Sequence, residues 1–242
     1  MEVHGLRLVA SSEILKTLGL PRDFYNVAVL RDGATGPGLL EMDLEETRRA
    51  VTRHPWMKEV TVRKAYPNRL VITAVERTPV ATVVAANGLY LVADDGVILG
   101  PAAGYDGRLP MFLGLRLTGS LRSPQVPGAS SPAPDLASAR LGPGDRTSAA
   151  GLGAVVDVLA ARQSTPDPGG VFSDLRAVDF SPAREIVMQF RDVRARFSVD
   201  RLAREWQRLL AVRADIERRG CRRCELDLRF PDRVVVRPQR AV

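Results

Sequence analysis

The side chains best able to do chemistry in this sequence are two cysteines, Cys221 and Cys224, which are separated by two arginines. This spacing suits a redox pair or one half of a zinc site. Zinc needs two further ligands, and the only histidines, His4 and His54, lie far away in the sequence. Redox pairs usually open a helix, whereas the segment that follows Cys224 is typical of a strand. We therefore expect an incidental or structural role for both cysteines.

The remaining polar residues do not form a catalytic motif. His54 directly precedes Pro55 at a predicted helix end, where helix capping is the expected role. Asp94, Asp95 and Gly96 have the composition of a hairpin turn and lack the further carboxylates of a calcium loop. The sequence contains no nucleophile elbow, phosphate-binding loop, dinucleotide fingerprint or zincin motif. We predict no catalytic activity, no cofactor and no metal site.

The net charge of +7 makes nucleic acid, an anionic membrane surface and acidic proteins candidate partners. The arginines are spread along the whole chain and only 5% of the residues are aromatic. A basic segment with interleaved aromatic residues, which would favour nucleic acid, is therefore missing. A nucleic-acid-binding protein remains the less favoured alternative. The sequence also lacks the run of about 18 apolar residues that would predict a membrane-spanning helix.

The first 78 residues predict a small α+β unit. Asp43, with Glu46 three residues later, predicts a helix N-terminus, and Pro55 predicts the end of that helix. Polar and apolar residues alternate on both sides of a Tyr-Pro-Asn-Arg turn, which predicts a hairpin with one buried face. The predicted elements are a strand at 2–9, a helix at 12–20 with Ser11 or Ser12 as its N-cap, an extended excursion at 22–38, the helix from Asp43, and the hairpin.

From about residue 79 onward, short alternating segments with turn signals predict a second, β-rich α+β unit. Residues 118–147 are rich in Ser, Pro, Ala and Gly, which predicts a flexible loop. Two helices interrupt the strands, and the longer one has Asp200 as its expected N-cap and Gly220 at its end. Its apolar stripe consists of Leu202, Trp206, Leu209, Val212 and Ile216.

The final predicted strand, residues 233–238, is short, β-branched and stopped by a proline. A terminal strand often lies at a sheet edge, where its unpaired backbone groups can accept an incoming strand. The alternative is a central strand, or an edge that its flanking arginines protect. We predict partner binding here, through Val234, Val235 and Val236. The arginines expected to select acidic partner residues are Arg233 and Arg237, with Arg184 and Arg229 as further candidates.

Three segments resemble the extracytoplasmic part of the bacterial cell-division family FtsQ, called DivIB in Gram-positive bacteria. Residues 39–81 are similar to the family's helix, Pro-Trp-hydrophobic motif, basic strand, Pro-containing turn and Glu-Arg-x-Pro ending. Residues 89–99 and 109–115 are similar to its Asp-x-Gly hairpin and Leu-Pro segment, and residues 225–238 to its last two strands.

The resemblance implies a POTRA domain at 1–78, with an insertion at 22–38, followed by an FtsQ-type β domain at 79–242. It also implies a non-catalytic scaffold of the divisome and the septum. Its implied partners are the division proteins FtsB (DivIC) and FtsL. The implied location is the outer face of the cytoplasmic (inner) membrane, with a single anchor helix ahead of the first strand and not included in the given sequence. A POTRA-containing envelope chaperone or secretion component is the alternative, although such proteins usually continue into a membrane barrel.

Overall fold

The computed structural model describes residues 2–19, 42–66, 69–105, 107–121, 136–164, 172–218 and 223–238. The chain divides into two compact units, Met1–Thr78 and Pro79–Val242. Both units combine helices with sheets, which is the predicted α+β class. The excursion predicted at 22–38 lies outside the described residues.

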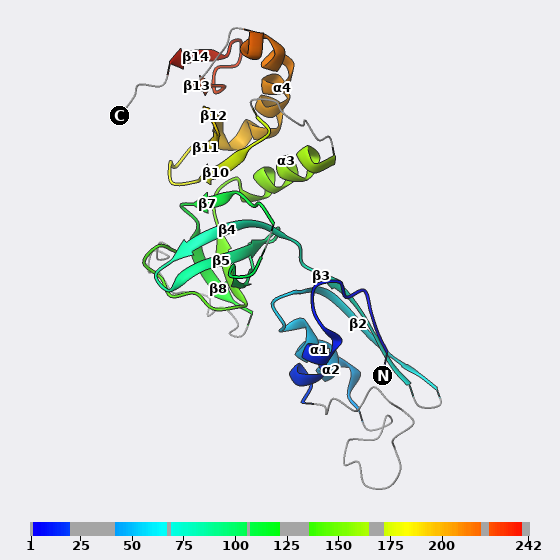
Figure 1. Ribbon diagram of the computed structural model, residues 1–242. Coiled ribbons are helices and arrows are strands. Elements are labelled where there is room, and N and C mark those ends of the chain that lie inside the picture. The colour runs from blue at the N-terminus through cyan, green and yellow to red at the C-terminus, as the bar shows by residue number, and fades with distance from the viewer. Residues whose placement is uncertain are drawn as a thin grey trace. The chain divides into compact units, whose positions relative to one another are not determined.

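The first unit is a three-stranded sheet with two helices. Its strand β3 is central, with β1 parallel to it on one side and β2 antiparallel on the other. Figure 1 shows α1 and α2 together on one side of this sheet. The predicted order of strand, helix, helix, strand, strand is confirmed. The elements are β1 (Glu2–His4), α1 (Ser11–Thr17), α2 (Leu44–Thr52), β2 (Met57–Ala65) and β3 (Arg69–Glu76).

The alternation along β2 and β3 decides which face of this sheet is buried. Leu70 and Ile72 on β3 pack against Ile14 of α1 and Val51 of α2 in one hydrophobic cluster. Thr61, on the opposite face of β2, is exposed. Because successive side chains of a strand point to opposite faces, the apolar side chains gather on one face of the sheet. The apolar sides of both helices are buried against that face.

The start of the first unit differs from the prediction in two places. β1 ends at His4 rather than at residue 9, because Gly5 takes a φ of +89°, outside the range of a strand. Glycine is needed there, since a Cβ atom would lie 2.0 Å from the Ala74 carbonyl oxygen. The N-cap of α1 is Ala10, without a side-chain hydrogen bond, so the prediction of Ser11 or Ser12 as the cap was wrong. The cap of α2 is confirmed, since the Asp43 carboxylate accepts from two backbone N–H groups.

The second unit is built on a nine-stranded sheet in the order β14-β13-β12-β11-β10-β7-β4-β5-β6, with a two-stranded sheet of β8 and β9 beside it. Its helices are α3 (Leu152–Ser164) and α4 (Leu202–Arg218). The strands are β4 (Pro79–Ala85), β5 (Gly88–Ala93), β6 (Ile98–Pro101), β7 (Met111–Leu113), β8 (Arg116–Ser120), β9 (Asp145–Ser148), β10 (Leu175–Asp179), β11 (Glu185–Phe190), β12 (Val193–Ser198), β13 (Cys224–Asp227) and β14 (Val235–Pro238).

The apolar stripe predicted for α4 is confirmed. Trp206 and Leu209 are buried in the core of the second unit, where Trp206 lies close to the rings of Phe190 and Phe197 on the sheet. Asp200 is not the N-cap, because it lies inside a short 3-10 turn, η3 (Val199–Arg201), that precedes the helix. The predicted end of this helix at Gly220 lies outside the described residues.

The prediction of a flexible loop at 118–147 was wrong for its described ends. Residues 116–120 and 145–148 pair with each other as β8 and β9. Leu136 and Leu141 are buried in the core of the second unit, although they sit in a segment rich in small residues. Such a composition disfavours regular structure but does not prevent single leucines from anchoring a connection.

Candidate partner-binding edge

The predicted terminal strand, β14, forms one end of the nine-stranded sheet, next to β13 (Figure 1). β14 begins at Val235. Arg233 and Val234 therefore precede the strand, whereas the prediction had placed both of them on it. Arg237 lies on the strand and is exposed. Arg184 is exposed on the connection from β10 to β11, and Arg229 lies between β13 and β14.

The hydrogen bonds of β13 fix the direction of the backbone groups in β14. Successive residues of an inner strand direct their N–H and C=O groups alternately to the two neighbouring strands. The N–H of Cys224 donates to Asp192, and the N–H of Leu228 donates to Arg196, both on the β12 side. The even-numbered residues of β13 therefore direct their backbone N–H and C=O groups to β12, and the odd-numbered residues direct theirs to β14.

The register then identifies the backbone groups of β14 that no described strand binds. Asp227 faces Val235 in the antiparallel pair, so the backbone groups of Val235 point inward to β13. Leu226 faces Val236. Because the backbone groups of Leu226 point to β12, Leu226 and Val236 form a non-hydrogen-bonded pair. Val236 consequently points its N–H and C=O away from the sheet. Its neighbour in the same orientation, Pro238, has only a carbonyl to offer.

The side chains of β14 give the edge two different faces. Val236 is 47% exposed and lies on the same face as the buried Leu226. Arg237 lies on the opposite face, next to Glu225 across the pair. A strand added to this edge would therefore meet an apolar side chain on one face and a guanidinium on the other.

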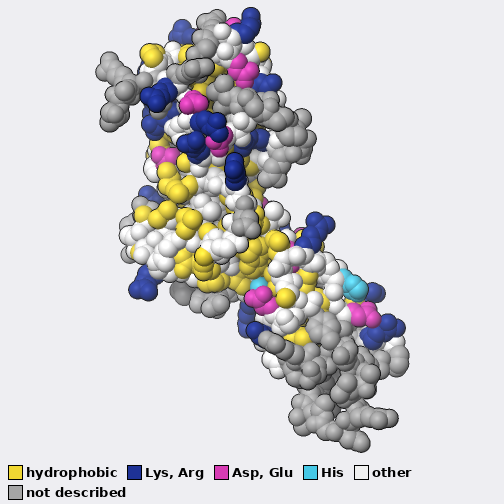
Figure 2. All heavy atoms as spheres, in the orientation of Figure 1, with side chains coloured by type: hydrophobic (Ala, Val, Ile, Leu, Met, Phe, Trp, Pro, Cys, Tyr) yellow, Lys and Arg dark blue, Asp and Glu magenta, His cyan; other side chains and the backbone are white. Residues whose placement is uncertain are grey.

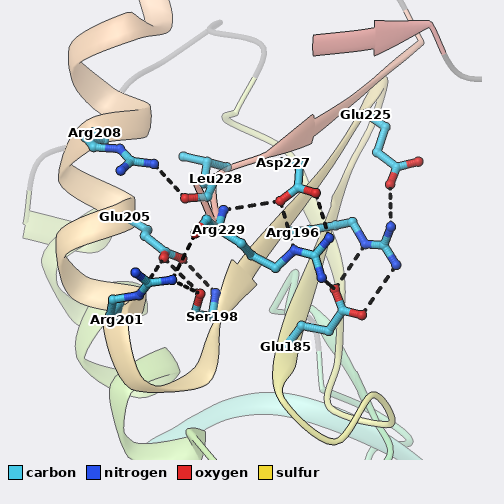
Figure 3. Close-up of polar contacts among 10 residues, drawn as sticks. All are labelled: Glu185, Arg196, Ser198, Arg201, Glu205, Arg208, Glu225, Asp227, Leu228 and Arg229. Atoms are coloured by element: carbon cyan, nitrogen blue, oxygen red, sulfur yellow. Dashed lines mark hydrogen bonds and ion pairs between the residues drawn. The ribbon is translucent and has the colours of Figure 1, made fainter. Parts of the chain in front are cut away.

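An ion-pair network covers the open face of β11 to β13 beside this edge (Figure 3). Arg229 binds both carboxylate oxygens of Asp227, and its Nη1 lies 2.9 Å from Glu185 Oε2. Arg196 lies 3.2 Å from the same Glu185 oxygen and donates to Glu225 at 3.1 Å. The charge of Arg229 is thus partnered within the chain, which favours a positioning role over a direct contact with an acidic partner.

The pKa values within the network follow from these contacts. Hydrogen bonds from the Arg229 guanidinium lower the pKa of Asp227 below its ordinary value, against the opposing effect of burial. The same hydrogen bonds raise the pKa of Arg229. Both groups therefore carry full charge at neutral pH, and the network holds the end of β13 as an ionised unit.

Helix α4 contacts the connection from β13 to β14 from its other side. Arg208 donates to the carbonyls of Leu228 and Pro231, and Arg201 of the preceding η3 turn donates to the carbonyl of Arg229. The sequence did not predict these contacts of Arg201 and Arg208. Their spacing from the apolar stripe of the helix predicts only that both side chains face solvent. Arg196 had a signal that was missed, because Arg194 and Arg196 alternate with buried residues along β12.

Other features favour neither a metal site nor a dense basic surface. Among the described residues, no three His, Cys, Asp or Glu side chains are grouped to hold a metal ion. Asp94 and Asp95 form the predicted turn between β5 and β6. On the face shown in Figure 2, basic side chains are interspersed with acidic ones. Within the part of the chain that the structure describes, no helix is both long and apolar enough to span a bilayer.

Known proteins resemble this chain in the first unit and beyond it. A family model for the POTRA domain of FtsQ type matches residues 27–77. Cell division protein FtsQ of Myxococcus fulvus is 33% identical over 90 residues, and that of Anaeromyxobacter sp. (strain K) is 38% identical over 81 residues. Cell division protein FtsQ of Rhizobium meliloti is 30% identical over 115 residues.

These three matches cover 37%, 33% and 47% of this chain, and 31%, 27% and 33% of the respective relatives. The chain therefore matches about a third of the length of each relative. The three-stranded sheet with its two helices agrees with the matched POTRA domain. The comparisons therefore identify an FtsQ-type POTRA domain within residues 27–77 and show that this chain is similar to cell division protein FtsQ over part of its length.

Proposed function

We propose that this protein is a non-catalytic scaffold of bacterial cell division that binds other division proteins during septum formation. Its kinship with FtsQ supports the role in division. In this proposal residues 1–78 act as the POTRA domain and residues 79–242 as the FtsQ-type β domain. The protein works at the outer face of the cytoplasmic membrane as a single-pass protein, which its resemblance to FtsQ supports.

The free edge at Val236 is the observation that carries the binding mode. A partner strand, from the division proteins FtsB (DivIC) or FtsL, pairs with β14 and extends the nine-stranded sheet. The backbone groups of Val236 supply hydrogen bonds, and its exposed side chain supplies an apolar contact. Arg237 faces acidic residues of the partner. Arg233, which precedes β14, and Arg184, which precedes β11, are further candidate cations.

Proline at position 236 tests this binding mode. Val236→Pro removes one outward N–H, while the internal bonds of Val235 and Arg237 to β13 remain. We expect an affinity for the purified FtsB/FtsL pair that is weaker by about tenfold, as the loss of one hydrogen bond predicts. Val236→Thr is the matched control, because it keeps both the N–H and the β-branched shape, and it should bind nearly as well as the wild type.

Proline at position 235 serves as a contrast. The Val235 N–H belongs to the ladder with β13, so Val235→Pro should detach β14 itself and also lower the affinity. Amide hydrogen exchange separates the two cases. In the wild type, the Val236 amide should exchange freely until the FtsB/FtsL pair is added and then become protected. Unchanged affinity in folded Val236→Pro, together with an unprotected Val236 in the complex, would exclude pairing at this edge.

A further inference from the structure

We propose that Arg201, at the end of the η3 turn, and Arg208 of α4 are positioning residues that hold β14 in place for its partner strand. This inference rests on the proposed function, since it concerns how the same edge is presented. Neither arginine contacts the edge itself. Both act through the connection between β13 and β14, to which they donate hydrogen bonds.

β14 has little of its own to keep it ordered. It is four residues long and pairs with β13 alone among the described strands. Val236, Arg237 and Pro238 are all exposed, so burial stabilises the strand only slightly. Edge strands with few buried contacts open with small free energies. An ordered β14 therefore depends on the segment that leads into it.

Arg201 and Arg208 bind the backbone of that leading segment. Arg208 Nη1 donates to the Pro231 carbonyl at 2.7 Å, and its Nη2 donates to the Leu228 carbonyl at 2.6 Å. One guanidinium thus bridges the two ends of a four-residue stretch. Arg201 Nη2 donates to the carbonyl between them, that of Arg229, at 2.9 Å. Both arginines are drawn in Figure 3 on the helix side of the connection.

The side chain of Arg229 holds the same stretch from the strands. It leaves the connection toward Asp227 and Glu185, while its carbonyl accepts from Arg201. The connection is therefore fixed from the helix through its carbonyls and from the sheet through one side chain. Hydrogen bonds from a charged donor are about twice as strong as neutral ones. A segment fixed in this way does not have to be ordered again when a partner strand binds, which improves affinity.

Amide exchange in the protein without its partner tests the positioning directly. The amides of Val235 and Arg237 bond to β13 and are protected only while β14 is in place. In Arg208→Ala we expect these amides to exchange about tenfold faster, while the amides of β11 and β12 keep their wild-type rates. The affinity for the FtsB/FtsL pair should fall by a similar factor, about tenfold.

Two further variants separate positioning from general effects. Arg204 lies on the same helix, is exposed, and makes no hydrogen bond or ion pair with the described residues, so Arg204→Ala removes the same charge without removing a contact. It should change neither exchange nor affinity. Arg208→Lys keeps the charge but cannot bridge two carbonyls with one planar group. It should therefore restore only part of the protection, and Trp206 fluorescence confirms that each variant is folded.

The outcomes distinguish this inference from the proposed function. Wild-type exchange at Val235 and Arg237 in folded Arg208→Ala, with wild-type affinity, would overturn the positioning role and leave edge pairing intact. A wild-type protein whose Val236 amide stays unprotected in the presence of the FtsB/FtsL pair would overturn edge pairing. In that case, faster exchange in Arg208→Ala would still show that α4 orders β14, although not for this partner.

Discussion

Arg229 and Asp227 form a bidentate ion pair, with Nε 2.9 Å from Oδ1 and Nη2 2.7 Å from Oδ2. The Arg229 backbone N–H donates to the same carboxylate at 3.2 Å, so three donors of one residue serve one acceptor group. Asp227 is buried and Arg229 is partly exposed. The pair sits where β13 ends and the chain turns toward β14, so its charge state affects the base of the proposed partner-binding edge.

This pair makes the stability of the second unit depend on acid pH. The pKa of Asp227 is lower in the folded protein than in the unfolded chain, chiefly through the hydrogen bonds from Arg229. Its contribution is therefore fully present above the unfolded pKa of about 3.9 and is lost as pH falls through the lower folded value. We expect the free energy of unfolding to decline below about pH 4, measured by urea unfolding with Trp206 fluorescence.

Asp227→Asn is the variant that isolates this effect. It keeps the shape and one acceptor oxygen but removes the titrating charge. We expect lower stability than the wild type at pH 7 and a smaller loss between pH 5 and pH 3. Equal slopes for the two proteins over that range would assign the acid sensitivity to other carboxylates.

A buried arginine stabilises the first unit. Arg77 is 4% exposed and donates to the carbonyls of Pro55 and Met57, at the corner where the chain passes from α2 into β2. Arg77→Ala leaves these acceptors without this donor, so we expect a loss of about 1–3 kcal/mol in the free energy of unfolding. The measurement uses Trp56 fluorescence in a Trp206→Phe background, because the sequence has two tryptophans, one in each unit.

The same design supplies its own control. Arg77→Lys retains the charge and one donor direction, and it should recover only part of the lost stability. Thr73→Ala is the control. Thr73 is exposed on β3, four residues before Arg77 in the sequence. If Thr73→Ala and Arg77→Ala weaken the Trp56 transition equally, Arg77 has no special role at this corner.

A buried glutamate joins α4 to the end of β12. Glu205 is 2% exposed, and its carboxylate accepts from both the N–H and the hydroxyl of Ser198, at 2.6 Å and 2.9 Å. Glu205→Ala leaves a backbone N–H without its acceptor, and we expect a loss of about 1.5–3 kcal/mol in Trp206-monitored unfolding. Ser198→Ala, which removes only the hydroxyl, should cost less. The reverse order would contradict the assignment of the backbone bond as the stronger contact.

The sequence predicted the local patterns well because they depend on periodicity. Alternation placed Val60 and Thr61 on opposite faces of β2, and the spacing from Leu202 to Ile216 identified the buried stripe of α4. Strand pairing across the second sheet was not predictable in this way. β7 pairs with both β4 and β10, and β12 with β13 across the whole of α4, which are choices that long-range packing makes.

The contacts around the candidate edge explain what sequence reasoning missed there. The terminal strand was visible as Val-Val-Val between two arginines, so its edge position could be anticipated. The contacts that Arg201 of η3 and Arg208 of α4 make with the connection could not be anticipated, because their acceptors there are backbone carbonyls. A carbonyl belongs to every residue and leaves no mark in the sequence. Likewise, the outward direction of the Val236 N–H and C=O groups depends on which residues of β13 bond to β12 and which bond to β14. That alternation follows from the strand register, which the sequence does not give.

Asn87 shows how a segment of unpromising composition is anchored to the second unit. Its side-chain amide donates to the Leu141 carbonyl at 2.9 Å and its oxygen accepts from the Leu141 N–H at 2.9 Å. The side chain thus pairs with Leu141 as a neighbouring strand would. Leu141 is buried as a result, within a stretch whose Gly and Pro content had predicted a flexible loop. The turn that carries Asn87 connects β4 with β5, so this contact joins the turn to the segment ahead of β9.

Asn87→Asp tests this pairing with minimal change of shape. Asparagine offers both a donor and an acceptor, whereas a carboxylate can only accept and would face the Leu141 carbonyl. We expect Asn87→Asp to lower the free energy of unfolding by about 1–3 kcal/mol, at least as much as Asn87→Ala. Amide exchange should also accelerate at Leu141 in both variants, ahead of the rest of the unit. Protection of Leu141 that survives in Asn87→Ala would show that the apolar core alone holds this segment, and that the amide pairing is incidental to it.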